Sequence, residues 1–111
     1  MADKRRRLIE IIAAKSLNKD RSFKLASGGA SGFYFDMKPT LLDPEGATLA
    51  ADLILERLEG ERVDLVGGLA LGAVPIIAAV TVRSHAGRRA IPGFFVRKEE
   101  RADEWPFPGF T

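Results

Sequence analysis

Residues 63–75 read VDLVGGLALGAVP, and this segment indicates the class of fold. The apolar run Val63–Val66 is typical of a buried strand in a parallel sheet. It continues into the glycine-rich segment Gly67–Gly72 and then into an apolar helix predicted from about Ala73 to Val82. A strand, a glycine-rich loop and a helix in this order bind phosphate through backbone N–H groups at the helix N-terminus. The segment matches neither G-x-G-x-x-G nor the P-loop pattern, so a plain strand-to-helix turn is the alternative interpretation.

A second parallel strand is predicted after this helix. Residues Ile91–Val96 (IPGFFV) are mostly apolar, and they end in the charged run RKEER at residues 97–101. Open α/β sheets bind ligands at the carboxyl ends of their strands, where arginine and lysine pair with phosphate oxygens. The alternative is an ordinary solvated charge run. The polar residues His85–Arg89 between helix and strand predict a turn with an exposed histidine.

The segment SGGASGFYFDMKPTLLDPEG, residues 27–46, joins small flexible residues to an aromatic run and a helix start. Phe33–Met37 is predicted to be a strand that pairs with Phe23–Leu25 in a hairpin. Alternation along this strand places its two phenylalanine rings on one face and Tyr34 on the other. Bulky rings beside glycines suit a flat, partly apolar, anionic ligand, because glycine allows close approach. The alternative is that the rings form the core of the hairpin.

Two further helices are predicted from apolar spacing and capping residues. Apolar side chains recur at helical spacing over Asp3–Leu17, with Asp3 as the N-cap. In the second helix Asp43 is the N-cap, Pro44 occupies the first helical position, and Glu45 favours the positive end of the helix dipole. Gly60 is predicted to end this helix.

The composition fits one globular domain of ordinary size. The chain has 111 residues, 46% of them hydrophobic, and a formal net charge of +2. Without cysteine and with a single histidine, it forms neither disulfides nor thiolate or histidine-cluster metal sites. Its densest basic cluster, Lys4–Arg7, indicates either a nucleic-acid contact or a solvated helix face. No apolar run approaches the roughly 20 residues that span a bilayer, so we expect a cytoplasmic protein.

Four ordered segments share their motifs with one enzyme family. They are FKLASG (Phe23–Gly28), FYFDMKPTLLDPEG (Phe33–Gly46), VDLVGGLALGAVP (Val63–Pro75) and FFVRKE (Phe94–Glu99). In motif and order they resemble orotate phosphoribosyltransferase, from about residue 8 to residue 99. The resemblance implies an α/β fold of the type I phosphoribosyltransferase kind, with a parallel sheet, flanking helices and an N-terminal hood. Residues 1–99 would be the N-terminal part of that domain, with the hood at about 18–42, and residues 100–111 would be a divergent tail.

The resemblance also implies an activity. The family transfers a 5-phosphoribosyl group from PRPP to orotate, giving orotidine 5′-phosphate and pyrophosphate in pyrimidine (UMP) biosynthesis. It therefore implies a pentosyltransferase, with Mg²⁺ bound together with PRPP. It further implies a cytoplasmic homodimer with no nucleic-acid or membrane partner. Positive charge develops on the ribose carbon in the transition state, and cations stabilise the departing pyrophosphate.

The site residues implied by the resemblance form two groups. They are an orotate group, Ser27, Gly28, Tyr34 and Phe35, and a PRPP group, Leu71, Gly72, Arg97, Lys98 and Arg101. Within the second group, Leu71 and Gly72 would lie near the pyrophosphate of PRPP. The three cations would contact its phosphates, partly across a dimer interface, and Lys98 and Arg101 would also act in catalysis. No residue is implied as a metal ligand.

The sequence departs from the family pattern at several positions. Some members carry lysine in place of Ala26 and Gly72, and Asp103 stands where a loop histidine is expected. The family's acidic PRPP signature and the later strands of its sheet do not occur in these 111 residues. We therefore expect a chain truncated or frameshifted after Glu99, with little or no turnover. An alternative from another class is a non-catalytic regulatory module that binds PRPP or a nucleobase.

Overall fold

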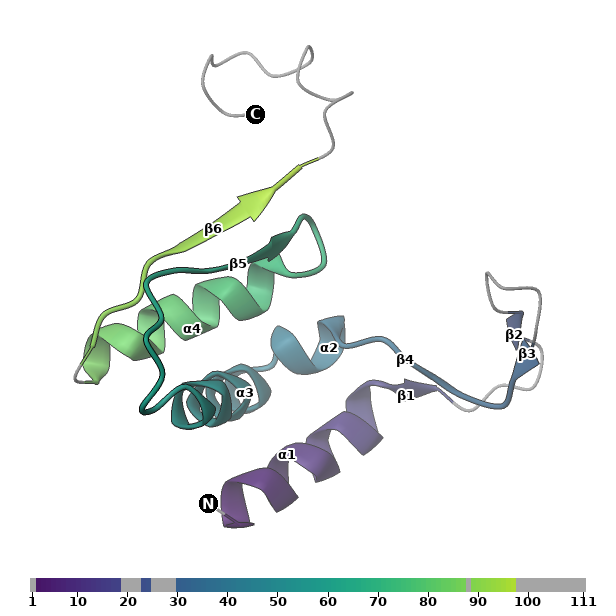
Figure 1. Ribbon diagram of the computed structural model, residues 1–111. Coiled ribbons are helices and arrows are strands. Elements are labelled where there is room, and N and C mark those ends of the chain that lie inside the picture. The colour runs from purple at the N-terminus through teal and green to yellow at the C-terminus, as the bar shows by residue number, and fades with distance from the viewer. Residues whose placement is uncertain (1, 19–22, 25–29, 88, 98–111) are drawn as a thin grey trace. The chain divides into compact units, whose positions relative to one another are not determined.

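The computed structural model describes residues 2–18, 23–24, 30–87 and 89–97 (Figure 1). The chain divides into two compact units, Met1–Ala50 and Ala51–Thr111, and the boundary falls inside the helix α3 (Pro44–Arg57). A helix and short strand pairs form most of the first unit. The second contains a parallel strand pair with its connecting helix. The predicted α/β class with a parallel sheet is therefore confirmed.

In the first unit a helix is followed by short strands and a single helical turn. The elements before α3 are α1 (Ala2–Lys15), β1 (Leu17–Asn18), β2 (Phe23–Lys24), β3 (Ala30–Ser31), β4 (Tyr34–Phe35) and α2 (Lys38–Leu41). The predicted first helix is confirmed, and Ile11 of its apolar stripe is buried. Because α1 already includes Ala2, Asp3 lies in the first turn and is not the N-cap.

The strand pairing differs from the predicted hairpin. β4 pairs antiparallel with β1, with Leu17 opposite Phe35, whereas β2 pairs with β3. The predicted pairing of Phe23–Leu25 with Phe33–Met37 is therefore wrong. Pairing with β1 places Phe35 in an apolar groove with Leu17 and side chains of α1. Alternation within one strand shows which side chains share a face, but it does not identify the partner strand.

Two buried hydroxyl groups hold the end of α1 against α2. The side-chain oxygens of Ser16 and Thr40 are 2.5 Å apart, and both residues are fully buried. The carbonyl of Ser16 also accepts a hydrogen bond of 2.9 Å from the N–H of Asp36. Because buried polar groups are costly unless they are bonded, these contacts fix the segment after β4 relative to α1.

The start of α3 forms as predicted. A carboxylate oxygen of Asp43 accepts a hydrogen bond of 2.8 Å from the N–H of Gly46, which makes Asp43 the N-cap. A Cβ atom at Gly46 would collide with the carbonyl oxygen of Thr40, so α2 and α3 approach closely at this glycine. Arg7 of α1 donates two hydrogen bonds of 2.8 Å to the carboxylate of Glu45. The first turn of α3 is thus tied to both preceding helices.

The second unit contains the predicted order of strand, loop, helix and strand. β5 (Val66–Leu69) and β6 (Gly93–Val96) pair in parallel, with Val66 opposite Gly93, and α4 (Val74–Ala86) connects them. Both strands begin later than predicted. The predicted turn at His85–Arg89 is wrong at its start, because His85 is exposed in the last turn of α4. Basic residues such as His85 suit a helix C-terminus, where the helix dipole is negative.

The glycines of residues 67–68 belong to β5 and not to the loop after it. A Cβ atom at Gly68 would lie 2.7 Å from the Cβ of Ala73, and one at Gly67 would collide with the ring of Phe94. On the neighbouring strand, a Cβ atom at Gly93 would lie 2.6 Å from a methyl carbon of Ile77. These glycines therefore allow α4 to pack closely on one face of the strand pair and Phe94 to lie over the other.

Side-chain hydrogen bonds fasten the entry to β6. The buried hydroxyl of Ser84 accepts a hydrogen bond of 2.9 Å from the N–H of Ile91. Arg83 donates two hydrogen bonds, of 2.8 and 3.1 Å, to the carboxylate of Asp52, and these bonds raise the pKa of Arg83 above its ordinary value. Arg89 donates to the carbonyl of Glu61 at 2.8 Å. Together these contacts set where β6 starts and therefore where it ends.

Candidate functional site

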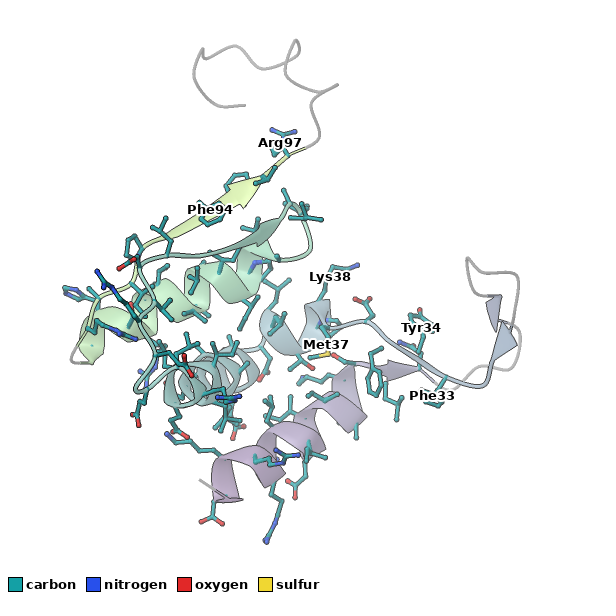
Figure 2. The ribbon with its side chains drawn as sticks, in the orientation of Figure 1. Phe33, Tyr34, Met37, Lys38, Phe94 and Arg97 are labelled. Atoms are coloured by element: carbon teal, nitrogen blue, oxygen red, sulfur yellow. The ribbon has the colours of Figure 1, made fainter. Side chains whose placement is uncertain are left out.

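Two segments that were predicted to bind phosphate meet at one edge of the parallel pair. β5 and β6 run in the same direction, so the residues that follow them lie at the same end of the sheet. The N–H of Ala70 donates a hydrogen bond of 2.9 Å to the carbonyl of Val96, which immediately precedes Arg97. The structure therefore brings the Leu71–Gly72 loop and Arg97 to one edge (Figure 2).

The loop between β5 and α4 presents backbone N–H groups. Leu71 is 81% exposed, and a Cβ atom at Gly72 would lie in open space. The carbonyl of Leu71 accepts a hydrogen bond of 3.1 Å from the N–H of Val74. Among the described residues, the N–H groups of Leu71 and Gly72 themselves make no backbone hydrogen bond.

The start of α4 adds positive potential to this loop. Its first turn carries no acidic side chain, and its second residue is Pro75. The N-terminus of a helix bears a partial positive charge and attracts anions. Backbone donors and this dipole thus lie at the edge where Arg97 follows β6, and a basic residue near such donors suits a phosphate or pyrophosphate group.

The two aromatic residues implied for orotate point to opposite sides of β4. Tyr34 is 39% exposed, and successive side chains of a strand alternate between its faces. The ring of Phe35 lies on the other side, 5.9 Å from the ring of Phe33 in an edge-to-face arrangement. Their side chains therefore do not line one face together. Lys38 forms an ion pair with Asp36 at 3.4 Å and projects from the start of α2 (Figure 2).

The remaining implied residues are not placed together by the structure. Ser27, Gly28, Lys98 and Arg101 lie outside the described residues. Tyr34 and Phe35 belong to the first unit, whereas Leu71, Gly72 and Arg97 belong to the second. The geometry of the candidate site is thus defined for the edge that the Leu71–Gly72 loop shares with Arg97.

Sequence reasoning missed two concave surfaces. An apolar groove of about 480 Å³ in the first unit is lined by Ile9, Ile12, Ala13, Leu17, Phe35 and Met37. A cavity of about 680 Å³ in the second unit is lined by Leu55, Glu59, Gly60, Arg83, Ser84, Gly87, Arg89 and Ile91. The apolar stripe of the first helix is a signal for the groove. The cavity depends on long-range packing near the beginning of β6, for which the sequence carries no local pattern.

The described residues contain neither a metal cluster nor a membrane span. No group of three or more histidine, aspartate or glutamate side chains is placed to hold a metal ion within that part of the chain. At the candidate edge, Leu71, Gly72 and Arg97 offer N–H donors and a cation, which do not fit Mg²⁺, an ion that takes oxygen ligands. Of the helices in the described ranges, none has the length and apolarity to cross a bilayer.

The fold is shared with solved phosphoribosyltransferases, although no family model matches the sequence. A phosphoribosyltransferase from Corynebacterium diphtheriae has a TM-score of 0.72 to this chain at 28% sequence identity, over 87% of this chain and 52% of that one. The parallel pair, its loop and its helix are therefore part of a phosphoribosyltransferase fold, which the described chain forms incompletely.

Within this class the chain is similar to orotate phosphoribosyltransferases. A curated relative of that name from Rhodopseudomonas palustris (strain TIE-1) is 48% identical over 97 residues, which are 87% of this chain and 51% of the relative. The orotate phosphoribosyltransferase of Mycobacterium tuberculosis H37Rv, in complex with PRPP, has a TM-score of 0.69 at 32% identity, over 86% of this chain and 54% of that one. The predicted resemblance is confirmed. The chain spans about half the length of the curated relatives it matches.

Proposed function

We propose that this chain is the N-terminal half of an orotate phosphoribosyltransferase and carries its pyrophosphate-binding edge. The proposal depends chiefly on one observation, the hydrogen bond from the Ala70 N–H to the Val96 carbonyl. This bond holds the Leu71–Gly72 loop beside Arg97 at the positive end of α4. The 48% identity to an orotate phosphoribosyltransferase supports the choice of reaction.

The edge would act on the leaving group of the transfer. In the proposed reaction a ring nitrogen of orotate loses its proton to solvent and bonds to the ribose carbon, while the bond from that carbon to the pyrophosphate oxygen breaks. The electron pair of the broken bond stays on pyrophosphate, so negative charge grows there. The Leu71 and Gly72 N–H groups, the α4 dipole and Arg97 would stabilise that charge. Lys98 and Arg101 would add cationic charge to the same group.

The base would be held by the hood segment of the first unit. Tyr34 lies on the opposite side of β4 from Phe35 and is 39% exposed, and its ring would stack on a flat ligand. Phe35 would contribute backbone groups, because its ring lines the apolar groove. Ser27 and Gly28 would complete the orotate contacts.

Several further properties are proposed from the similarity. They are a Mg²⁺ ion that arrives with PRPP, assembly as a homodimer, a cytoplasmic location and a place in UMP biosynthesis. Mg²⁺ would be held by the oxygens of PRPP, since the described residues at the edge do not fit it. We expect little or no turnover from this chain by itself, because it spans 51% of the R. palustris relative. A PRPP- and orotate-dependent assay with normal turnover would contradict that expectation.

The phosphate-binding role is tested by two substitutions at one open position. Gly72→Asp places a carboxylate in the loop and should weaken PRPP binding at least about tenfold, because like charges repel at short range. Gly72→Ala adds a methyl group in open space and should bind PRPP as the unchanged chain does. Calorimetric titration with PRPP measures both. Equal PRPP affinities for the two variants would contradict the assignment of this loop.

Binding without turnover has a second interpretation. A chain that forms the phosphate-binding edge but spans half of an enzyme could bind PRPP or a nucleobase as a non-catalytic regulatory module. Titration with orotate helps to separate the two proposals. The N-terminal half of an orotate phosphoribosyltransferase would bind orotate through its hood segment and give heat with orotate as well as with PRPP. A module that senses PRPP alone would give heat with PRPP and none with orotate.

A further inference from the structure

The proposed base carries a negative charge, and its proposed contacts supply no positive one. Orotate is a pyrimidine with a carboxylate group, which is ionised at neutral pH. The residues proposed to hold it are Ser27, Gly28, Tyr34 and Phe35, and none of them is basic. A carboxylate that leaves water needs a charged or hydrogen-bonding partner. Lys38 is the only basic residue between positions 25 and 56, so it is the candidate for that partner.

Backbone pairing places Asp36 on the same side of the chain as Tyr34. The N–H of Asp36 donates a hydrogen bond of 2.9 Å to the carbonyl of Ser16. Because Leu17 lies opposite Phe35, this bond continues the pairing of β1 with β4 by one residue. Side chains two positions apart on an extended chain share a face, so Tyr34 and Asp36 both lie on the side away from Phe35.

Asp36 in turn holds Lys38. Its Oδ1 atom accepts a hydrogen bond of 3.2 Å from the Lys38 backbone N–H and lies 3.4 Å from the Lys38 ammonium nitrogen. The Lys38 side chain is 70% exposed. An ammonium group has three N–H donors, so one carboxylate oxygen of Asp36 leaves donors for a second carboxylate.

The spacing suits one small ligand. Tyr34 and Asp36 are two residues apart on an extended chain, which corresponds to about 7 Å. A pyrimidine that stacks on the Tyr34 ring can therefore extend its carboxylate to an ammonium held beside Asp36. In the view of Figure 2 the side chains of Tyr34 and Lys38 both project upwards from this segment.

We propose that Lys38 pairs with the carboxylate of orotate and makes the hood segment select an anionic base over an uncharged pyrimidine. Asp36 acts as a positioning residue, because it holds the ammonium on the side of the Tyr34 ring. This inference rests on the proposed function and assigns a specificity-determining residue to the same reaction. The alternative is an ordinary exposed ion pair, which contributes little to stability and nothing to recognition.

The experiment compares orotate with its uncharged methyl ester. Amide chemical shifts of the isotope-labelled chain, followed by NMR during titration, give the affinity for each compound. We expect the unchanged chain to bind orotate at least about tenfold more tightly than the ester, because a charge-assisted hydrogen bond is lost in the ester. Lys38→Met should bind the two compounds within about twofold of each other, and Lys38→Arg should keep the preference for orotate.

A matched lysine in the same unit provides the control. Lys15 forms an ion pair with Asp43 at 3.7 Å, and its side chain is 46% exposed. Lys15→Met therefore removes the same charge and a similar ion pair, and it should leave the preference for orotate unchanged. Both lysines have exposed side chains, so neither variant is expected to unfold the chain, and the amide spectrum without ligand checks this.

The outcomes separate this inference from the proposed phosphate-binding edge. A preference for orotate that survives in Lys38→Met, or that Lys15→Met removes equally, would overturn the role of Lys38. The absence of saturable orotate binding to this chain would overturn it too. PRPP titration reports on the second unit, so loss of PRPP binding with a Lys38-dependent preference for orotate would count against the phosphate-binding edge alone.

Discussion

At the scale of single residues, the ion pair between Arg7 and Glu45 makes the stability of the first unit depend on pH. Both oxygens of Glu45 accept hydrogen bonds of 2.8 Å from Arg7, and these bonds hold the pKa of Glu45 below its ordinary value of 4.5. A depressed carboxyl pKa stabilises the fold above the unfolded pKa, and this contribution is lost as the pH falls through the folded value.

The prediction is a pH-dependent effect of Glu45→Gln. At pH 7 the variant should unfold at a slightly lower temperature than the unchanged chain, because exposed ion pairs contribute little. The difference should disappear as the pH is lowered well below 4.5. Thermal unfolding followed by circular dichroism measures it, with Glu59→Gln as the exposed control. A difference that persists in acid would contradict this role for the Arg7–Glu45 pair.

The role of a single residue could be predicted from the sequence where that role depends only on residues a few positions away. Asp43 caps α3 as predicted, because an N-cap needs only a side-chain oxygen and the N–H three residues ahead. Gly67 and Gly68 are predicted to belong to the glycine-rich loop, whereas they lie within β5. Their missing side chains leave room for the Phe94 ring and for Ala73. A contact with a residue as far along the chain as Phe94 leaves no local pattern in the sequence.

At the scale of elements, the position of β6 depends on a buried serine of α4. The hydroxyl of Ser84 bonds to the N–H of Ile91, two residues before β6. Ser84→Ala leaves this buried N–H unpaired and should lower the free energy of unfolding by roughly 1–3 kcal/mol. Thr48→Ala removes an exposed hydroxyl that bonds to the Pro44 carbonyl, and it should change the same quantity by less than about 0.5 kcal/mol.

Urea unfolding and amide exchange test this assignment together. Ser84→Ala should shift the urea midpoint downwards and speed exchange of the Ile91 amide. The Thr48→Ala variant should alter neither. An unchanged Ile91 exchange rate in Ser84→Ala, with the urea midpoint also unchanged, would show that the hydroxyl does not hold β6.

The elements themselves were predicted more fully than their pairing. The helices α1, α3 and α4 and the strand β6 could be predicted, because hydrophobic spacing and caps lie within each segment. The strand predicted at Val63–Val66 shares only Val66 with β5. The pairing of β4 with β1 could not be predicted from the sequence. It brings Phe35 beside Leu17 and side chains of α1 in the apolar groove, and these residues are far from Phe35 in the sequence. The edge with Leu71 and Arg97 followed from the parallel order of its two strands.

At the scale of the whole molecule, the chain combines the proposed phosphate-binding edge with an exposed apolar face of the β5–β6 pair. The edge consists of backbone groups and Arg97 fixed by the Ala70–Val96 hydrogen bond. On the face of the pair that does not contact α4, Leu69 is largely exposed. A chain spanning 51% of a curated relative has this combination of a partial site and an incomplete sheet. We therefore expect ligand binding to survive in this chain better than turnover does.

The central claim, that this edge binds PRPP, is tested most directly by calorimetric titration of two arginine variants. Arg97→Met removes the cation at the edge, and Arg62→Met removes an exposed arginine elsewhere in the second unit. Both lose one positive charge, so general electrostatic attraction changes equally. We predict saturable PRPP binding that Arg97→Met weakens at least about tenfold and Arg62→Met leaves within about twofold. No saturable PRPP binding, or equal weakening by the two variants, would contradict the account.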